Sequence, residues 1–105
     1  MNARTEFITD IVDTAFGGGI NYWAEISDGK IREYDDEGPV GEWIRVTPHL
    51  VEKGLTLVKD PSFQVRDDIL AAILLGDRNN DAGEIDIEAA DVIIQAAVFG
   101  QITYG

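Results

Sequence analysis

The sequence predicts an α+β domain, in which a small antiparallel sheet of three to four strands packs with about four helices. Apolar residues recur with the period of a helix in four segments, whereas they alternate with polar residues around an Asp-Gly turn. The predicted order is one helix, three strands, three helices and a final strand, which is typical of this fold class. A chain of 105 residues has the length of one domain, so we expect a single domain over residues 1–105.

The first half of the chain predicts a helix, a hairpin and a third strand. Thr5 can cap the helix, and the three glycines at 17–19 stop it. Alternation in the next segment predicts a strand that buries Tyr22 and turns Trp23 to its other face. The predicted bounds are residues 5–16 for the helix, 20–26 and 30–34 for the hairpin strands around Asp28-Gly29, and 42–46 for the third strand.

The second half predicts three helices and a closing strand. Thr47 supplies a capping hydroxyl, and Pro48 follows at the first helical position, where its missing N–H does no harm. Asp86 can cap the last helix, and Gly100 can end it. The predicted bounds are residues 48–59, 62–75 and 87–99 for the helices and 101–104 for the strand.

The chain is strongly acidic, with 20 acids, eight lysines and arginines, and a formal net charge of −12. Such a field repels nucleic acid and anionic membrane surfaces and steers the protein toward a basic partner. Acidity also keeps a small protein soluble, so both interpretations stay open. The absence of cysteine excludes a disulfide framework and a thiolate metal site, and the apolar runs are too short to span a membrane.

One segment has part of the spacing of a calcium loop. Asp77, Asn79 and Asp81 alternate as hard-cation ligands do, and Glu88 stands at the twelfth position of the loop. The expected glycine is displaced, because Gly83 is seventh rather than sixth. A polar loop between two helices explains the same residues, so calcium is the only cofactor candidate and otherwise we expect none.

No catalytic constellation stands out, so we expect a protein that is not an enzyme. His49 is the only histidine, and no serine lies in a recognisable nucleophile motif. Adjacent carboxylates such as Asp35-Asp36 are expected by chance in so acidic a chain. Trp23 and Trp43 are either interface anchors or parts of a core covered on both faces, and the sequence supports both interpretations.

Two segments resemble a family of small proteins encoded by phages and bacterial mobile elements. The stretch at 18–23, GGINYW, resembles a GGIxYW pattern near the start of those proteins. The stretch at 85–105, from Ile85-Asp86 to ADVIIQAAVFGQITYG, resembles their ending ID…ADxIIQxALFGEIVYG, with Gln101 where an acid is expected. The resemblance implies a phage-type accessory protein in the cytoplasm of a bacterial host, and it assigns no activity.

Charge and resemblance together predict a non-enzymatic accessory protein that binds a basic host protein, with mimicry of nucleic acid as one way of doing so. The alternatives are a structural phage protein that self-associates and a calcium-stabilised binding domain. We expect no direct contact with nucleic acid or membrane. The candidate contact residues are Asp35, Asp36, Glu37, Asp77, Asp81, Glu84, Asp86, Glu88 and Asp91, with Trp23 and Trp43 as aromatic anchors.

Overall fold

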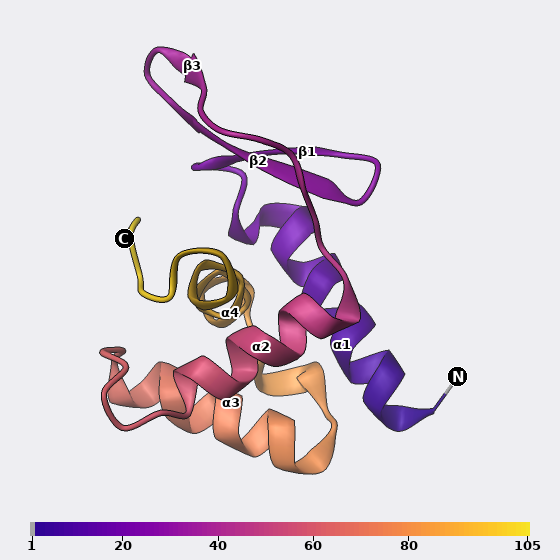
Figure 1. Ribbon diagram of the computed structural model, residues 1–105. Coiled ribbons are helices and arrows are strands. Elements are labelled where there is room, and N and C mark those ends of the chain that lie inside the picture. Colours follow the sequence, from indigo (N-terminus) through magenta and orange to yellow (C-terminus); the bar gives the residue numbers. More distant parts are fainter. Residues whose placement is uncertain (1) are drawn as a thin grey trace.

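The computed structural model describes residues 2–105 and confirms the α+β class. Within these residues the chain forms four α-helices and a four-stranded antiparallel sheet, with the helices gathered below the sheet in Figure 1. A π-helical turn, η1, extends the first helix, and a 3₁₀ turn, η2, precedes the last one. The bounds are Ala3–Thr14 (α1), Ala15–Gly19 (η1), Pro48–Val58 (α2), Asp67–Asn79 (α3), Ala82–Glu84 (η2) and Ile87–Phe99 (α4).

The sheet is built around β2, because each of the other strands pairs with it. Asp28 and Gly29 join β1 to β2 with φ angles of 53° and 74°, which confirms the predicted two-residue turn. The C-terminal end of β2 pairs with β3, and this part of the sheet projects from the body of the molecule (Figure 1). We call the segment from the end of β2 to the end of β4, residues 35–45, the hairpin arm. The strand bounds are Ala24–Ser27 (β1), Lys30–Asp35 (β2), Gly38–Pro39 (β3) and Ile44–Arg45 (β4).

The core is organised around α4, whose residues 89–97 are all buried. Glycines on two neighbouring elements let their backbones approach it closely. A Cβ added at Gly54 of α2 would lie 2.3 Å from the carbonyl oxygen of Ile93, and one added at Gly19 would lie 2.8 Å from that of Ile87. No helix in residues 2–105 has both the length and the apolar character needed to cross a membrane.

Three predicted helix ends are confirmed. Asp86 caps α4 through its Oδ1, which accepts a hydrogen bond from the Ala89 N–H at 2.8 Å, and Gly100 ends the helix with a φ of 75°. Thr47 Oγ1 likewise accepts from the Leu50 N–H at 3.1 Å, just ahead of Pro48. These local signals place α2 and α4 correctly.

Two predictions for the N-terminal half are wrong. Helix α1 begins before Thr5, because Asn2 Oδ1 accepts the Thr5 N–H at 2.8 Å and acts as the cap instead. Residues 20–23 form a turn rather than a strand, with the Ala24 N–H donating to the Ile20 carbonyl at 2.9 Å. In this turn Trp23 rather than Tyr22 enters the core, so Trp23 is buried and Tyr22 is half exposed, whereas Ile20 and Ala24 are buried as predicted.

Three boundaries in the rest of the chain also differ. The helix predicted over 62–75 is α3, which starts later because the Asp60 carboxylate accepts from Ser62 and holds a turn there. The strand predicted over 42–46 is reduced to β4, and β3 supplies the remaining strand. Residues 101–104 form no strand, because the backbone of Thr103 and Tyr104 bonds to a side chain, Gln95, in place of a neighbouring strand.

Candidate functional site

A buried polar network joins α4 to the segment before β1. The Asp91 carboxylate, in a side chain only 7% exposed, accepts hydrogen bonds from three neutral donors. Trp23 Nε1 and Gln95 Nε2 donate to its Oδ1 at 2.8 Å and 2.9 Å, and the Tyr22 hydroxyl donates to its Oδ2 at 2.5 Å. Among the described residues, no lysine, arginine or histidine forms an ion pair with Asp91. The negative charge is therefore held by hydrogen bonds alone.

The fully buried Gln95 extends this network to the C-terminal segment. Its Oε1 accepts from the backbone N–H groups of Thr103 and Tyr104 at 2.8 Å and 2.9 Å, and its Nε2 donates to the Tyr104 carbonyl at 2.9 Å. The Tyr104 ring stacks on Trp23 with centroids 5.6 Å apart, and its hydroxyl donates to Glu33 on β2. Gln95 thus holds the C-terminal segment, which we call the tail (residues 101–105), against α4, and Tyr104 connects this tail to β2.

Beside this network lies a groove of about 550 Å³, which we call the α3–α4 groove. Its walls come from the start of α3, the first half of α4, the glycines of η1 and the C-terminal segment. Two of its lining residues are strongly exposed, Ile87 at 57% and Tyr22 at 51%. The apolar lining consists of Val65, Ile69, Ile87, Val92 and Ile102, and the polar lining of Tyr22, Arg66, Glu88, Asp91 and Tyr104.

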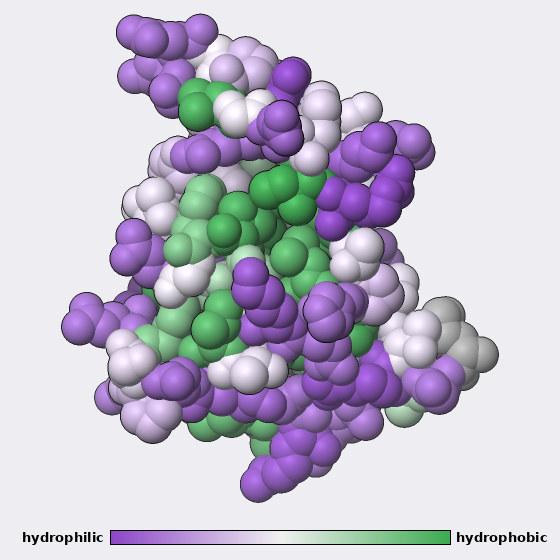
Figure 2. All heavy atoms as spheres, in the orientation of Figure 1, coloured by the Kyte–Doolittle hydropathy of each residue, from purple (hydrophilic) through white to green (hydrophobic). Residues whose placement is uncertain are grey.

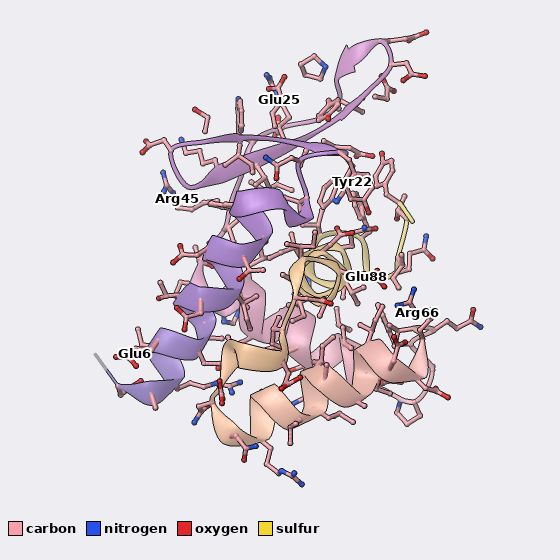
Figure 3. The ribbon with its side chains drawn as sticks, turned by 180° about the vertical axis from the view of Figure 1, so that it is seen from behind. Glu6, Tyr22, Glu25, Arg45, Arg66 and Glu88 are labelled. Atoms are coloured by element: carbon pink, nitrogen blue, oxygen red, sulfur yellow. The ribbon has the colours of Figure 1, made fainter. Side chains whose placement is uncertain are left out.

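One ion pair crosses the rim of the groove. Arg66 Nη2 lies 2.5 Å from Glu88 Oε1, and both side chains are at least half exposed. Figure 3 shows Arg66, Glu88 and Tyr22 gathered on the same side of α4. Arg66 also bonds to Asp68 at 3.1 Å, and it is the only base among the described lining residues. The groove therefore combines apolar walls with more acid than base.

Two tyrosines of the site have raised pKa values. Partial burial of the Tyr22 hydroxyl, then its bond to Asp91 and the charge of that carboxylate, raises the Tyr22 pKa well above its ordinary value. The bond that Tyr104 donates to Glu33 raises the pKa of Tyr104 to about 12. Both phenols stay protonated at neutral pH, so they serve as hydrogen-bond donors there rather than as general bases.

The predicted contact acids have different environments. Asp35, Asp36 and Glu37 are exposed at the end of the hairpin arm, and the turn is held by the Glu37 N–H donating to Asp35 Oδ1. The acids of the segment between α3 and α4 are also exposed, although two of them cap the elements that follow, η2 and α4. These are Asp81, Glu84 and Asp86.

Three other predicted acids are not free surface charges. Asp77 forms ion pairs with Arg4 at 2.7 Å and Lys59 at 2.8 Å. Partial burial opposes its ionisation, but these two cations outweigh burial and hold the pKa of Asp77 below its ordinary value. Glu88 is paired with Arg66. Asp91 is buried, so its prediction as a surface contact is wrong, because the helix period places it toward Trp23.

The two tryptophans also differ. Trp23 is 1% exposed and packs against Phe99, so it cannot anchor an interface, and the alternative core interpretation is correct. Trp43 remains 39% exposed on the hairpin arm, where its ring covers the guanidinium of Arg32 at 4.4 Å. Of the two tryptophans, only Trp43 therefore stays available as an aromatic contact.

The four residues of the calcium spacing do not converge. Asp77 and Asn79 lie in the last turn of α3, and Asp81 caps η2 by accepting from the Gly83 N–H. Glu88 lies in α4 and faces Arg66. Within residues 2–105 no group of three or more His, Cys, Asp or Glu side chains has a geometry that could hold a metal ion. Helix α3 thus extends past its predicted end at residue 75 and includes two residues of the predicted polar loop, Asp77 and Asn79.

Sequence reasoning missed several residues of this site and surface. Three acids, Glu6, Asp10 and Asp13, are exposed on the face of α1 opposite its buried side. Their spacing of four and three residues would have predicted that they share one helix face. Gln95 and Tyr22 carried no such signal, because their roles depend on a turn and on a tail that the local pattern does not predict.

Comparisons with protein-family models, with curated proteins and with solved structures each found no match. The site is therefore interpreted from its own geometry.

Proposed function

We propose that this chain is a non-enzymatic accessory protein that binds a basic protein partner. The observation that carries the proposal is the number of acids without a cation. Of the 20 acids, five form ion pairs within the described residues, namely Glu25, Glu52, Asp68, Asp77 and Glu88. Apart from Asp91, which is buried in the polar network, most of the other acids are exposed and can interact with solvent, counterions or a partner.

Three groups of exposed acids support this proposal. They lie at the tip of the hairpin arm (35–37), on the outer face of α1 (6, 10 and 13) and between α3 and α4 (81, 84 and 86). Charges of one sign spread over a small surface accelerate encounter with an oppositely charged partner and make binding salt-dependent. A nucleic-acid-binding protein is a natural candidate partner, because its basic surface already accommodates a dense row of negative charges.

The origin and location of the protein are part of the proposal. The segments at 18–23 and 85–105 that resemble phage and mobile-element proteins supply the residues of the buried network, including Tyr22, Trp23, Asp91 and Gln95. A role for these segments in maintaining the fold accounts for their pairing at the two ends of the chain. On this basis we place the protein in a bacterial cytoplasm, acting on a host protein.

A capture experiment tests the function. The purified protein is immobilised and exposed to nuclease-treated bacterial lysate over a series of salt concentrations, and retained proteins are identified by mass spectrometry. We expect one basic protein to be retained at low salt and to dissociate as salt rises. A charge variant replaces Glu6, Asp10 and Asp13 by Gln, Asn and Asn, and we expect it to release the partner at lower salt than wild type does. Equal capture by this variant and wild type at every salt excludes the α1 acids from the contact surface, whereas no basic protein retained at low salt would contradict the proposal.

Self-association is a second candidate function, and a specific surface supports it. Val40, Trp43 and Ile44 are each between 37% and 41% exposed on the hairpin arm. Figure 2 shows hydrophobic side chains reaching the surface between the sheet and α2. Light scattering over a concentration series tests this alternative with wild type and Trp43→Ser. A strict monomer at every concentration excludes it, whereas a dimer that Trp43→Ser dissociates supports it.

A further inference from the structure

We propose that the α3–α4 groove binds an apolar side chain together with a neighbouring arginine or lysine of a protein partner. The proposal rests on the proposed function, because it names where a basic partner inserts its anchor. The groove has a volume of about 550 Å³, and its apolar side chains leave room for a large aliphatic or aromatic side chain.

The exposed position of Ile87 is the first argument. This side chain opens the first turn of α4 and is 57% exposed, the largest fraction among the exposed large hydrophobic residues. It lines the same groove as Val65, Ile69 and Ile102, so it contributes to an apolar lining rather than standing alone. Contact with a partner's apolar side chain would remove this wall from water.

The charged side chains of the groove lining favour a basic occupant. The described lining carries two acids, the exposed Glu88 and the buried Asp91, against one base, Arg66. Asp91 is bound by neutral donors only, and Glu88 shares Arg66 with Asp68. Because the Arg66–Glu88 pair is solvent-exposed, it is worth little in free energy, and a partner's guanidinium can replace or join Arg66 there.

Tyr22 is the third element of the site. Its hydroxyl is fixed by Asp91 and by the Gln95 amide at 3.2 Å, while half of its surface stays exposed at the groove. An aromatic ring held in one orientation beside carboxylates is a favourable surface for a guanidinium or ammonium group. The site thus offers an apolar wall, an aromatic ring and carboxylates within one concave region.

Blocked tetrapeptides test this inference directly on the whole protein. The probes are acetyl-Gly-Leu-Arg-Gly-amide and its analogues with Gln or Glu in place of Arg. Binding is measured by two-dimensional NMR of ¹⁵N-labelled protein. The Trp23 indole N–H is a built-in reporter, because it donates to Asp91. We expect saturable shifts of this signal and of the Ile87 and Val92 amides, with the Arg peptide binding about tenfold more tightly than the Glu peptide.

Two pairs of variants separate the groove from the rest of the surface. Ile87→Ser and Glu88→Gln alter exposed groove residues, and each is expected to weaken binding of the Arg peptide several-fold. Leu74→Ser and Glu84→Gln are the controls, because both residues are exposed outside the groove lining. The inference is overturned if the Trp23 signal does not shift, if the three peptides bind equally, or if the controls weaken binding as much as the groove variants.

The outcome is distinguishable from a failure of the proposed function. Lysate capture with the same four variants tests the basic partner independently of the peptides. A partner that is retained equally by Ile87→Ser, Glu88→Gln and wild type leaves the proposed function intact and refutes the groove as its binding site. Peptide binding without any retained partner establishes the groove and refutes the proposed function.

Discussion

Helix α4 and the hairpin arm differ in how tightly the rest of the molecule contacts them. Residues 89–97 of α4 are all buried, and α2, α3 and η1 pack around the helix. In the hairpin arm, residues 35–45, every residue is exposed except Gly38. Stability is therefore concentrated at α4, whereas the hairpin arm has the freedom to carry charge and contacts. A change in one region should affect folding, and a change in the other should affect binding.

The two regions also use glycine in different ways. Gly54 and Gly19 give α4 close neighbours, because a side chain at either position would collide with a backbone carbonyl. Gly38 and Gly41 in the arm have φ angles of 118° and 80° with open space around them, so they serve the turn rather than packing. The same residue type is thus a packing requirement in one region and a conformational requirement in the other.

The largest expected effect is at the α2–α4 contact. Gly54→Ala places a methyl carbon 2.3 Å from the Ile93 carbonyl oxygen and 3.2 Å from Ala97 Cβ. Because both elements are held in the core, the helices must separate, and we expect a loss of about 3 kcal/mol in the free energy of unfolding. Urea denaturation measures it. Gly17→Ala is the control, since no atom lies within 4 Å of its added Cβ, and equal losses in both variants would show that α4 is not closely packed.

Gln95→Ala tests the polar junction at the other side of α4. The variant leaves two backbone N–H groups of the tail without partners, and it removes one donor to the Tyr104 carbonyl and one to Asp91. We expect a loss of about 2 kcal/mol in the free energy of unfolding, together with altered Trp23 fluorescence because Tyr104 no longer stacks. Gln101→Ala, at an exposed position of the same tail, is the control. An unchanged fluorescence spectrum in Gln95→Ala would contradict this role.

The raised tyrosine pKa values predict a smaller effect, confined to alkaline pH. Both folded-state pKa values lie above the ordinary value of 10.0, so the stabilising contribution of the protonated phenols is complete below pH 10 and declines above it, through about pH 12 for Tyr104 and to still higher pH for Tyr22. Tyr22→Phe and Tyr104→Phe should each flatten the decline of unfolding free energy with pH in this window. Denaturation curves at successive pH values measure the slope, and slopes identical to wild type would refute the assignment.

Local signals predicted much of the fold. Asp86 with Gly100, Thr47 with Pro48, and Asp28 with Gly29 are interactions within a few residues, and all three gave correct element boundaries or turns. The errors arose where a distant or unexpected partner decides the structure. The C-terminal segment alternates as a strand does, but its backbone groups bond to Gln95 on α4, a contact that alternation does not encode.

The candidate site was less accessible to sequence reasoning. Exposure was predicted correctly for the charged turn at 35–37, because consecutive acids rarely enter a core. It failed for Asp91 and left Trp23 undecided, and these two residues stabilise each other by a hydrogen bond across 68 residues of sequence. A buried charge paired with a buried indole follows from the three-dimensional arrangement, and neither residue reveals it alone.

The smallest expected effect on stability is at the tip of the hairpin arm. Replacing Asp35, Asp36 and Glu37 by Asn, Asn and Gln should change the unfolding free energy by less than about 0.5 kcal/mol, because all three are exposed. An asparagine in place of Asp35 keeps a side-chain oxygen that can accept the same hydrogen bond from the N–H of residue 37. Affinity for a basic partner should nevertheless fall, with a shallower dependence on salt. If the triple variant lost stability but bound the partner normally, the hairpin arm would contribute to folding rather than to partner contact, which would contradict the contrast between the arm and α4.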